Sequence, residues 1–314
     1  MPAATSGFRY QLSIVHSQLI FMSYRGRFAP TPSGPLHFGS LVAALASWLE
    51  ARSRQGQWFV RIDDLDPPRE VPGAADTILA QLDTFQLHWD GPVRYQSQRG
   101  DAYQDAVETL LTSGHAFYCA MTRQQLAALD HQHPGAAVAV PAAAGTAVRV
   151  TVPDQQLCFD DGIQGRTCAN LQREGGAFVI RRRDGLFGYQ LACALDDADD
   201  GITDVLRGAD LLDSTLRQRW LLACLQRPAP RYAHLPVVTD GRALKLSKSR
   251  GSDSVSERPP GQLMQAALQC MGLTVSDELH GAPPARLLQW ALEHYPQHRW
   301  PTGTEQPLPA LLQS

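Results

Sequence analysis

Residues 34–40, GPLHFGS, lie between a short apolar strand and an amphipathic helix, the junction from which α/β folds are built. The segment before them, YRGRFAP (24–30), has the pattern of a buried strand. From Gly39 to Gln55 apolar side chains recur at a spacing of three and four, which predicts a helix. Gly34 and Gly39 let the backbone approach a ligand closely, and the helix start offers unpaired N–H groups to an anion. His37 is expected to donate a hydrogen bond to a phosphate there; an ordinary turn histidine is the alternative.

The alternation of strand and helix continues downstream. WFVRID (58–63) predicts a strand, residues 74–87 and 98–114 predict helices, and FYCAM (117–121) predicts another strand. This order is typical of an α/β, Rossmann-like, doubly wound parallel sheet. Crossover units resume at YQLACALDDADDG (189–201), with a helix from Ser214 to Gln226 and Ser214 as its N-cap.

Four regions follow from this reading. Residues 23–115 and 184–235 are expected to form a nucleotide-binding catalytic domain. Residues 116–183 are expected to form an inserted α+β module containing a flexible Pro-, Gly- and Ala-rich loop at 131–147. Residues 236–314 follow with a small helical region, whose helices are expected near 261–272 and 284–295. Residues 1–22 are expected to be a poorly ordered extension, with Met22 as the start of the folded chain.

Bulk composition sets limits on the function. The chain has 314 residues, 44% of them hydrophobic, and a net charge of −3, so no global charge favours nucleic acid. The apolar run at residues 11–22 is too short to span a bilayer, so no membrane association is expected. Six cysteines without a CxxC pair indicate reduced thiols in a cytoplasmic protein.

A second short segment, KLSKS (245–249), makes the histidine more informative. Two lysines flank a Leu-Ser pair in a polar loop, where they could neutralise charge on a leaving pyrophosphate. A solvated surface charge run is the alternative for such a segment taken alone.

Together these segments resemble the two signatures of class I aminoacyl-tRNA synthetases. Four stretches resemble the glutamyl/glutaminyl branch of that family: RFAPTPSGPLHFGS (27–40), VRIDDLDPPRE (60–70), DGLFGYQLACALDD (184–197) and VLRGADLL (205–212). The resemblance extends from about Tyr24 to Ser249. It implies an ATP-dependent ligase that joins a glutamate carboxylate to the α-phosphate of ATP, with Mg²⁺ accompanying the nucleotide.

The resemblance also implies roles for individual residues. His37, Lys245 and Lys248 are the implied catalytic residues, and the implied ATP contacts are Pro35, His37, Gly39, Ser40 and Lys248. Arg27 and Arg207 occupy the family's positions for carboxylate recognition, and Asp63 stands where the family usually has a Glu near the substrate ammonium. The implied glutamate contacts are Arg27, Phe28, Ala29, Pro30, Thr31, Asp63, Tyr189 and Arg207.

Two departures from the family pattern stand out. Ser40 replaces the second histidine of the first signature, and a serine can still donate a hydrogen bond or cap the helix. Relatives carry a zinc site in the inserted module, but here only Cys119 matches, since Met121 replaces the next cysteine. His131 and His133 are conceivable substitutes that a flexible loop would hold poorly. We therefore expect no zinc and a buried, apolar Cys119.

The length of the chain bears on the nucleic acid that accepts the glutamate. Only residues 250–314 follow the lysine segment, too few for the anticodon-binding region of a glutamyl-tRNA synthetase. A compact chain with a radius of gyration of roughly 20 Å is expected to act at one end of a tRNA.

Within the branch, the motifs most resemble those of the short paralogues, which attach glutamate to queuosine in the anticodon loop of tRNA(Asp), and the short region after the lysine segment matches this resemblance. A truncated enzyme that charges the 3′ end of tRNA(Glu), or a non-catalytic tRNA-binding paralogue, are the alternatives. A monomer is expected. The basic run RRRD (181–184) is either a solvated face or a contact for tRNA phosphates.

Overall fold

A computed structural model describes residues 23–239, 255, 258–295 and 300–312 of the chain. The extension at 1–22 and both lysines of the KLSKS segment lie outside the described residues, so their predictions stay predictions. None of the helices in these ranges is long and apolar enough to cross a membrane.

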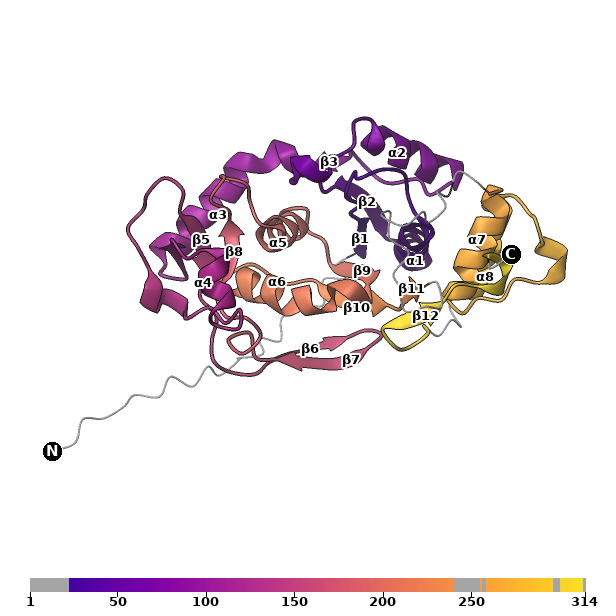
Figure 1. Ribbon diagram of the computed structural model, residues 1–314. Helices are drawn as coiled ribbons and strands as arrows, with labels where there is room; N and C mark the ends of the chain where they lie inside the picture. The colour runs from indigo at the N-terminus through magenta and orange to yellow at the C-terminus, as the bar shows by residue number, and fades with distance from the viewer. Residues whose placement is uncertain (1–22, 240–254, 256–257, 296–299, 313–314) are drawn as a thin grey trace.

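A parallel sheet forms the centre of the molecule (Figure 1). Strands β1 (Arg25–Phe28), β2 (Gln57–Ile62) and β3 (Arg94–Tyr95) pair in parallel in that order, and β9 (Asp204–Gly208) pairs in parallel with β10 (Arg231–Leu235). The two groups meet where the Thr203 N–H donates to the Arg25 carbonyl at 3.0 Å. The strands therefore follow one another across the molecule in the order β3-β2-β1-β9-β10, and the predicted Rossmann-like α/β class is confirmed.

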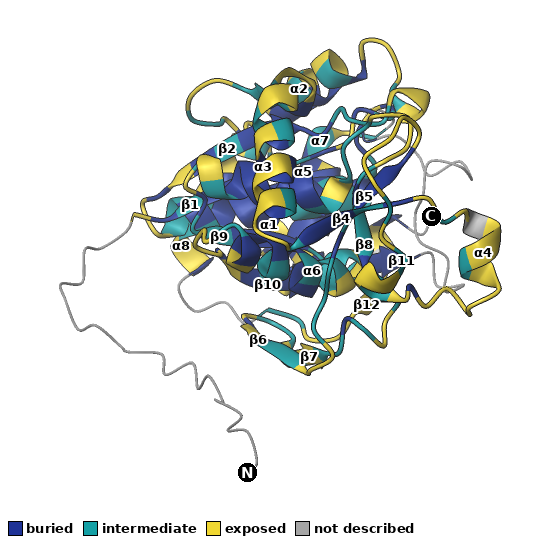
Figure 2. Ribbon diagram, turned by 90° about the vertical axis from the view of Figure 1, so that its left-hand side faces the viewer, coloured by how far each residue is buried: buried dark blue, intermediate teal, exposed yellow. Residues whose placement is uncertain are grey.

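Helices cover both faces of this sheet. Helix α1 (Phe38–Ser53) packs on one face through its buried leucines at 41, 45 and 49, and α5 (Tyr189–Asp199) covers the other (Figure 1). The alternation along β1 explains the division, because Phe28 belongs to the core beneath α1 while Arg27 points to Asp197 on α5. Figure 2 shows these inner elements as the dark, buried part of the molecule.

The remaining helices flank this centre. Helix α2 (Ala74–Thr84) connects β2 to β3, α3 (Gly100–Thr112) follows β3, and α6 (Leu212–Cys224) packs against α5. Helices α7 (Pro260–Cys270) and α8 (Pro284–His294) pack on α1. All of these helices confirm the sequence predictions to within a few residues at each end.

The predicted insert at 116–183 contains two separate structures. Strands β4 (Ala116–Cys119), β5 (Ala147–Val150) and β8 (Phe178–Arg181) form an antiparallel sheet. The short helix α4 (Arg123–Ala127) comes directly after β4 in the chain. The hairpin of β6 (Leu157–Asp161) and β7 (Gly165–Ala169) instead docks on β10, where the Gly162 N–H donates to the Tyr232 carbonyl at 2.9 Å. A parallel pair, β11 (Val237–Thr239) and β12 (Glu305–Pro307), continues from β10 toward the C-terminal helices.

Two of the sequence predictions, one about the start of α6 and one about the cysteines, are wrong. Ser214 is not an N-cap, because a 3₁₀ turn at Ala209–Leu211 starts the helix earlier and α6 begins at Leu212; the Ser214 hydroxyl instead accepts a hydrogen bond from Gln190 at 3.0 Å. The cysteines are not all reduced thiols, because Cys158 and Cys168 form a disulfide. The hairpin places these two residues directly opposite each other, with Cα atoms 4.1 Å apart, which their spacing in the sequence does not reveal.

Candidate active site

A cavity of about 670 Å³ opens beyond the carboxyl ends of β1, β2, β9 and β10. This is the edge at which open parallel sheets bind ligands. Of the residues predicted to contact glutamate, all line the cavity: Arg27, Phe28, Ala29, Pro30, Thr31, Asp63, Tyr189 and Arg207. His37, Gly39 and Ser40 line it as well, whereas Pro35 does not. The structure thus brings eleven predicted residues, from segments up to 180 residues apart, to one cavity.

His37 is the N-cap of α1, and both of its ring nitrogens contact Ser40. Its Nδ1 accepts from the Ser40 backbone N–H at 3.1 Å, and its Nε2 lies 2.9 Å from the Ser40 hydroxyl. Because Nδ1 accepts, a neutral ring carries its hydrogen on Nε2 and donates it to that hydroxyl. The suggestion that Ser40 caps the helix is therefore wrong, since His37 occupies the cap, but Ser40 fixes the tautomer of the predicted phosphate ligand.

The loop that carries His37 is held from two sides. The buried Gln81 of α2 accepts a hydrogen bond from the Leu36 N–H at 2.8 Å, and the Val255 N–H donates to the Leu36 carbonyl at 3.2 Å. Gly34 has a φ of 127°, which favours glycine. These constraints place the start of α1, with its unpaired N–H groups, at the wall of the cavity.

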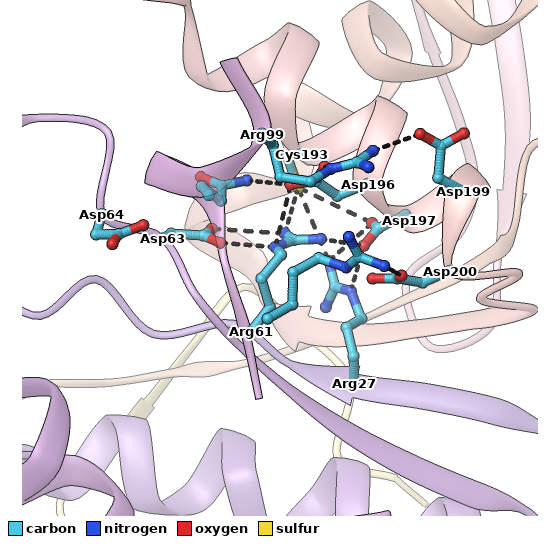
Figure 3. A network of polar contacts seen from close by, with 12 residues as sticks. Arg27, Arg61, Asp63, Asp64, Arg99, Cys193, Asp196, Asp197, Asp199 and Asp200 are labelled. Atoms are coloured by element: carbon cyan, nitrogen blue, oxygen red, sulfur yellow. Dashed lines mark hydrogen bonds and ion pairs between the residues drawn. The ribbon is translucent and has the colours of Figure 1, made fainter. Parts of the chain in front are cut away.

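A buried network of charges lies behind one side of the cavity (Figure 3). Arg27 forms a bidentate pair with Asp197, and Arg61 reaches both Asp197 at 2.6 Å and Asp63 at 2.7 Å. All four side chains are less than 10% exposed. Nε and Nη2 of Arg27 both donate to the Asp197 carboxylate, and Nη1 takes no part in this pair.

The two carboxylates of this network differ in their pKa values. Burial alone would raise the pKa of Asp197, but the neighbouring Arg27 and Arg61 outweigh it and lower the pKa from 3.8 to about 2. Burial raises the pKa of Asp63 in spite of its pairing with Arg61. The guanidinium of Arg61 opposes this rise without cancelling it, because a neighbouring positive charge favours the ionised carboxylate.

Arg207 faces the cavity from the end of β9 with most of its donors already used. Its Nε donates to His234 at 3.1 Å, and its Nη2 donates to the Thr215 hydroxyl at 2.8 Å and to the Leu211 carbonyl at 3.3 Å. Its Nη1 is buried and finds no hydrogen-bond partner among the described residues. A buried guanidinium nitrogen without a partner is costly, so this donor points to an acceptor supplied by a ligand.

Cys119, the one residue that matches the zinc site of relatives, has different neighbours from those expected. Cys119 is buried as predicted, but His133 is buried too, and its Nε2 lies 3.3 Å from the Cys119 sulfur. The expectation that the loop would hold His133 poorly is therefore wrong, since the Gly175 carbonyl and a 3₁₀ turn at Gly135–Val138 fix it. Within the described ranges, no three His, Cys, Asp or Glu side chains gather as a metal site would require. The absence of zinc stays a prediction.

The basic run at 181–183 makes contacts within the protein. Arg181 donates to Gln104 at 3.0 Å, Arg182 pairs with Asp184 at 2.7 Å, and Arg183 donates to the Ala120 carbonyl. Arg182 remains 45% exposed. Both alternatives for this run, a solvated face and a contact for tRNA phosphates, stay predictions.

Several residues around the cavity were missed from the sequence. Arg61 and Asp197 are buried charges, and His234 and Asp161 lie behind Arg207. A signal exists for the first two, because an arginine inside the strand WFVRI and a pair of aspartates inside an apolar helix are rarely buried without partners. No local pattern identifies Asp161, because its partner is 73 residues away.

Comparisons with known proteins agree with this geometry. The family model of the catalytic domain of class I tRNA synthetases (E and Q) matches residues 23–273. A glutamyl-Q tRNA(Asp) synthetase from Ectopseudomonas mendocina (strain ymp) is 48% identical over 280 residues, covering 89% of this chain and 95% of that protein. The protein of the same name from Vibrio vulnificus (strain YJ016) is 43% identical over 288 residues, covering 92% and 95%.

Solved structures show the same fold at lower identity. A glutamate–tRNA synthetase from Elizabethkingia anophelis superposes with a TM-score of 0.69 at 22% identity, covering 85% of this chain. This chain spans 65% of the length of that structure. A glutamate–tRNA ligase from Elizabethkingia meningosepticum, solved in complex with its amino acid, gives a TM-score of 0.66 at 23% identity, covering 88% of this chain and 70% of that one.

Proposed function

The chain belongs to the class I tRNA synthetases for glutamate and glutamine, and within them to the glutamyl-Q tRNA(Asp) synthetases, and from this membership we propose how its cavity works. The reaction is an ATP-dependent ligation. A glutamate carboxylate oxygen attacks the α-phosphorus of ATP, pyrophosphate leaves, and the resulting glutamyl-adenylate transfers its acyl group to a hydroxyl of queuosine in tRNA(Asp), releasing AMP. Mg²⁺ enters as the metal complex of the ATP substrate.

Glutamate is held at the charged side of the cavity. Arg207 offers its Nη1, and Arg27 the Nη1 side of its guanidinium, to the two substrate carboxylates, since a guanidinium matches a carboxylate in shape and charge. Asp63 receives the substrate ammonium. Tyr189, at the first turn of α5 and 38% exposed, adds a hydroxyl on the same side. The coexistence of these four groups in one cavity is the observation that carries the proposal.

ATP lies at the other side, against the start of α1. The backbone N–H groups there and the Nε2–H of His37 meet the phosphates, so an incoming phosphate oxygen competes with the Ser40 hydroxyl for that hydrogen. Little covalent work remains for the protein, because positioning and charge stabilisation lower the barrier.

The lysines of KLSKS complete the phosphate side in this proposal. Support comes from the described residues that flank their segment. Val238, shortly before it, lines the cavity, and Val255, shortly after it, is bonded to Leu36, one residue from His37. We propose that Lys248 neutralises the charge that develops on the leaving pyrophosphate and that Lys245 assists it.

The partners are L-glutamate, ATP and tRNA(Asp) carrying queuosine, and we propose that the enzyme acts as a monomer in the cytoplasm. No zinc is required in this scheme, because none of the groups proposed to bind glutamate or ATP comes from residues 116–183, the segment that carries the zinc site in relatives.

Two measurements test the function. ATP–pyrophosphate exchange with glutamate, in the absence of tRNA, should proceed with the wild-type protein and fall by about 100-fold or more in Lys248→Ala, as for loss of one strong transition-state contact. Nucleoside mass spectrometry of tRNA(Asp) after incubation with ATP and glutamate should show queuosine gaining one glutamyl group. Unmodified queuosine, or glutamate appearing on the 3′ end of tRNA(Glu) instead, would overturn the proposal.

A further inference from the structure

Arg207 is backed by a chain of buried polar groups that reaches the outer hairpin. His234 on β10 accepts from the Arg207 Nε at 3.1 Å, and its other ring nitrogen, Nδ1, lies 2.5 Å from Asp161 Oδ2. Both the imidazole and the carboxylate are fully buried. A guanidinium can only donate, so His234 Nε2 accepts from Arg207 and Nδ1–H donates to Asp161. The Thr215 hydroxyl also lies 3.1 Å from the same Nε2.

The hairpin in turn fixes Asp161. Its Oδ1 accepts from the backbone N–H groups of Ile163 at 3.0 Å, Gln164 at 2.9 Å and His234 at 3.1 Å. The Gln164 side chain donates to the His234 carbonyl at 2.8 Å. The turn of β6–β7 is therefore bonded to both the backbone N–H and the carbonyl of His234. The ring has little freedom to rotate, because both of its nitrogens are hydrogen-bonded, to Asp161 and to Arg207.

The protonation states favour this arrangement. Burial lowers the pKa of His234 below its ordinary value, and the nearby Arg207 adds to this, although the hydrogen bond to Asp161 opposes it. Burial alone would raise the pKa of Asp161, but its hydrogen bonds from His234 and from the backbone lower it. A neutral imidazole beside an ionised carboxylate is the state in which Nε2 can accept from Arg207.

We propose that His234 and Asp161 are positioning residues for Arg207, holding its guanidinium so that Nη1 faces a substrate carboxylate. This inference rests on the proposed function, in which Arg207 binds glutamate. The contacts of Arg207 to His234 and Thr215 come from residues that do not line the cavity, and its third partner, Leu211, belongs to the cavity wall. The guanidinium nitrogen without a partner among the described residues is the one left for a ligand. The hairpin thus contributes to the affinity for glutamate, and to the preference for glutamate over glutamine, without contacting the bound amino acid.

Four substitutions separate this role from a general structural one. His234→Leu removes the acceptor, while His234→Gln restores it, because the glutamine carbonyl can accept from Arg207 and its amide can donate to Asp161. Thr215→Val removes the neighbouring acceptor at nearly constant volume. Asp160→Asn is the matched control, since Asp160 lies next to Asp161 on the same strand but is 80% exposed and paired only loosely, at 3.6 Å, with Arg166.

Steady-state ATP–pyrophosphate exchange, with glutamate and ATP varied separately, reads out the effect. We expect the KM for glutamate to rise about 10-fold or more in His234→Leu and Thr215→Val, the size expected for losing a hydrogen bond to a charged group. The KM for ATP should change less than about 2-fold, and the preference for glutamate over glutamine should fall. His234→Gln should recover most of the glutamate KM, and Asp160→Asn should match wild type.

The outcomes distinguish the inference from the function on which it rests. A wild-type protein without exchange activity overturns the proposed function. An active wild type whose His234→Leu and Thr215→Val variants keep their glutamate KM, or raise both KM values together, overturns the positioning role alone. If circular dichroism shows that His234→Leu does not fold, Thr215→Val alone decides: an unchanged glutamate KM, or a rise in both KM values, overturns the positioning role.

Discussion

Arg27 and Asp197 form a bidentate ion pair across the interface between the sheet and α5, with Nε 3.0 Å from Oδ1 and Nη2 3.1 Å from Oδ2. The same carboxylate also receives Arg61. One buried aspartate thus balances two arginines, one of which lines the cavity. The pair sets the position of Arg27 before any substrate is present, so binding need not order that side chain.

Replacing this aspartate should be costly for folding. In Asp197→Asn two buried guanidinium groups lose their shared counter-charge, and we expect the free energy of unfolding at pH 7 to fall by about 3–5 kcal/mol. Urea denaturation followed by circular dichroism measures this. Asp105→Asn, an exposed site on α3, should change stability by less than about 0.5 kcal/mol. Equal losses in both variants would contradict the role assigned to the buried pair.

The same residue predicts how the stability depends on acid. The pKa of Asp197 is lowered from 3.8 to about 2 in the folded protein, so its contribution is fully present above pH 4 and is lost as the pH falls toward 2. This shift corresponds to about 2 kcal/mol. Asp63, whose raised pKa acts in the opposite direction, is present in both proteins. Asp197 contributes less to that shift than burial and the two arginines do, so most of the Asp63 effect cancels in the comparison. The stability difference between wild type and Asp197→Asn should therefore narrow over that pH range, and a difference independent of pH would argue against the pair.

Asp63 gives a third prediction because it lines the cavity and is proposed to receive the substrate ammonium. In Asp63→Ala the substrate ammonium loses its counter-charge, and we expect the KM for glutamate in the exchange assay to rise by about 10-fold or more, with the KM for ATP unchanged. Asp63→Glu keeps the charge with one more methylene and should stay within about 10-fold of wild type. A rise in the KM for ATP of the same size would place Asp63 outside the amino-acid site.

The disulfide can be tested by counting the free thiols. Cys158 and Cys168 are bonded, whereas Cys119, Cys193, Cys224 and Cys270 are free but buried. Alkylation in denaturant without reductant should therefore label four cysteines, and alkylation after reduction should label all six, as read by intact-mass spectrometry. Six labels before reduction, on protein purified without reductant, would show that the hairpin carries two thiols.

The outline of the fold and the residues of the cavity were accessible from the sequence because their signals are local. The three-four spacing of Leu41, Leu45, Trp48 and Leu49 identifies a helix regardless of the rest of the chain. The carboxyl ends of parallel strands share one edge, so residues that follow β1, β2 and β9 had to meet. What those residues do came from resemblance, since a lone His37 or Arg207 has no local pattern that reveals a ligand.

The contacts behind the cavity were not accessible, because they join distant segments. The alternation of LCFDD gives a strand but not its neighbour, and only the folded chain shows that Asp161 meets His234 rather than a residue of the antiparallel sheet. The disulfide has the same origin, since the register of the hairpin pairs Cys158 with Cys168. Buried polar groups of this kind depend on tertiary placement, which propensity and periodicity do not encode.

Two separate glycines, Gly56 and Gly100, offer a last test, of the close packing between the turn before β2 and the start of β1. A Cβ on Gly56 would lie 2.4 Å from the Tyr24 carbonyl oxygen and 2.6 Å from the Tyr24 Cβ, because the chain between α1 and β2 passes directly over the start of β1. We expect Gly56→Ala to destabilise the protein by about 1–3 kcal/mol in urea denaturation, since backbone would have to shift. Gly100, at the start of α3, has helical dihedral angles and nothing within 4 Å of a built Cβ, so Gly100→Ala should stabilise by about 0.5–1 kcal/mol. The opposite signs at two Gly→Ala sites follow from close approach alone, and a Gly56→Ala variant as stable as Gly100→Ala would show that β1 and the turn before β2 are not in contact.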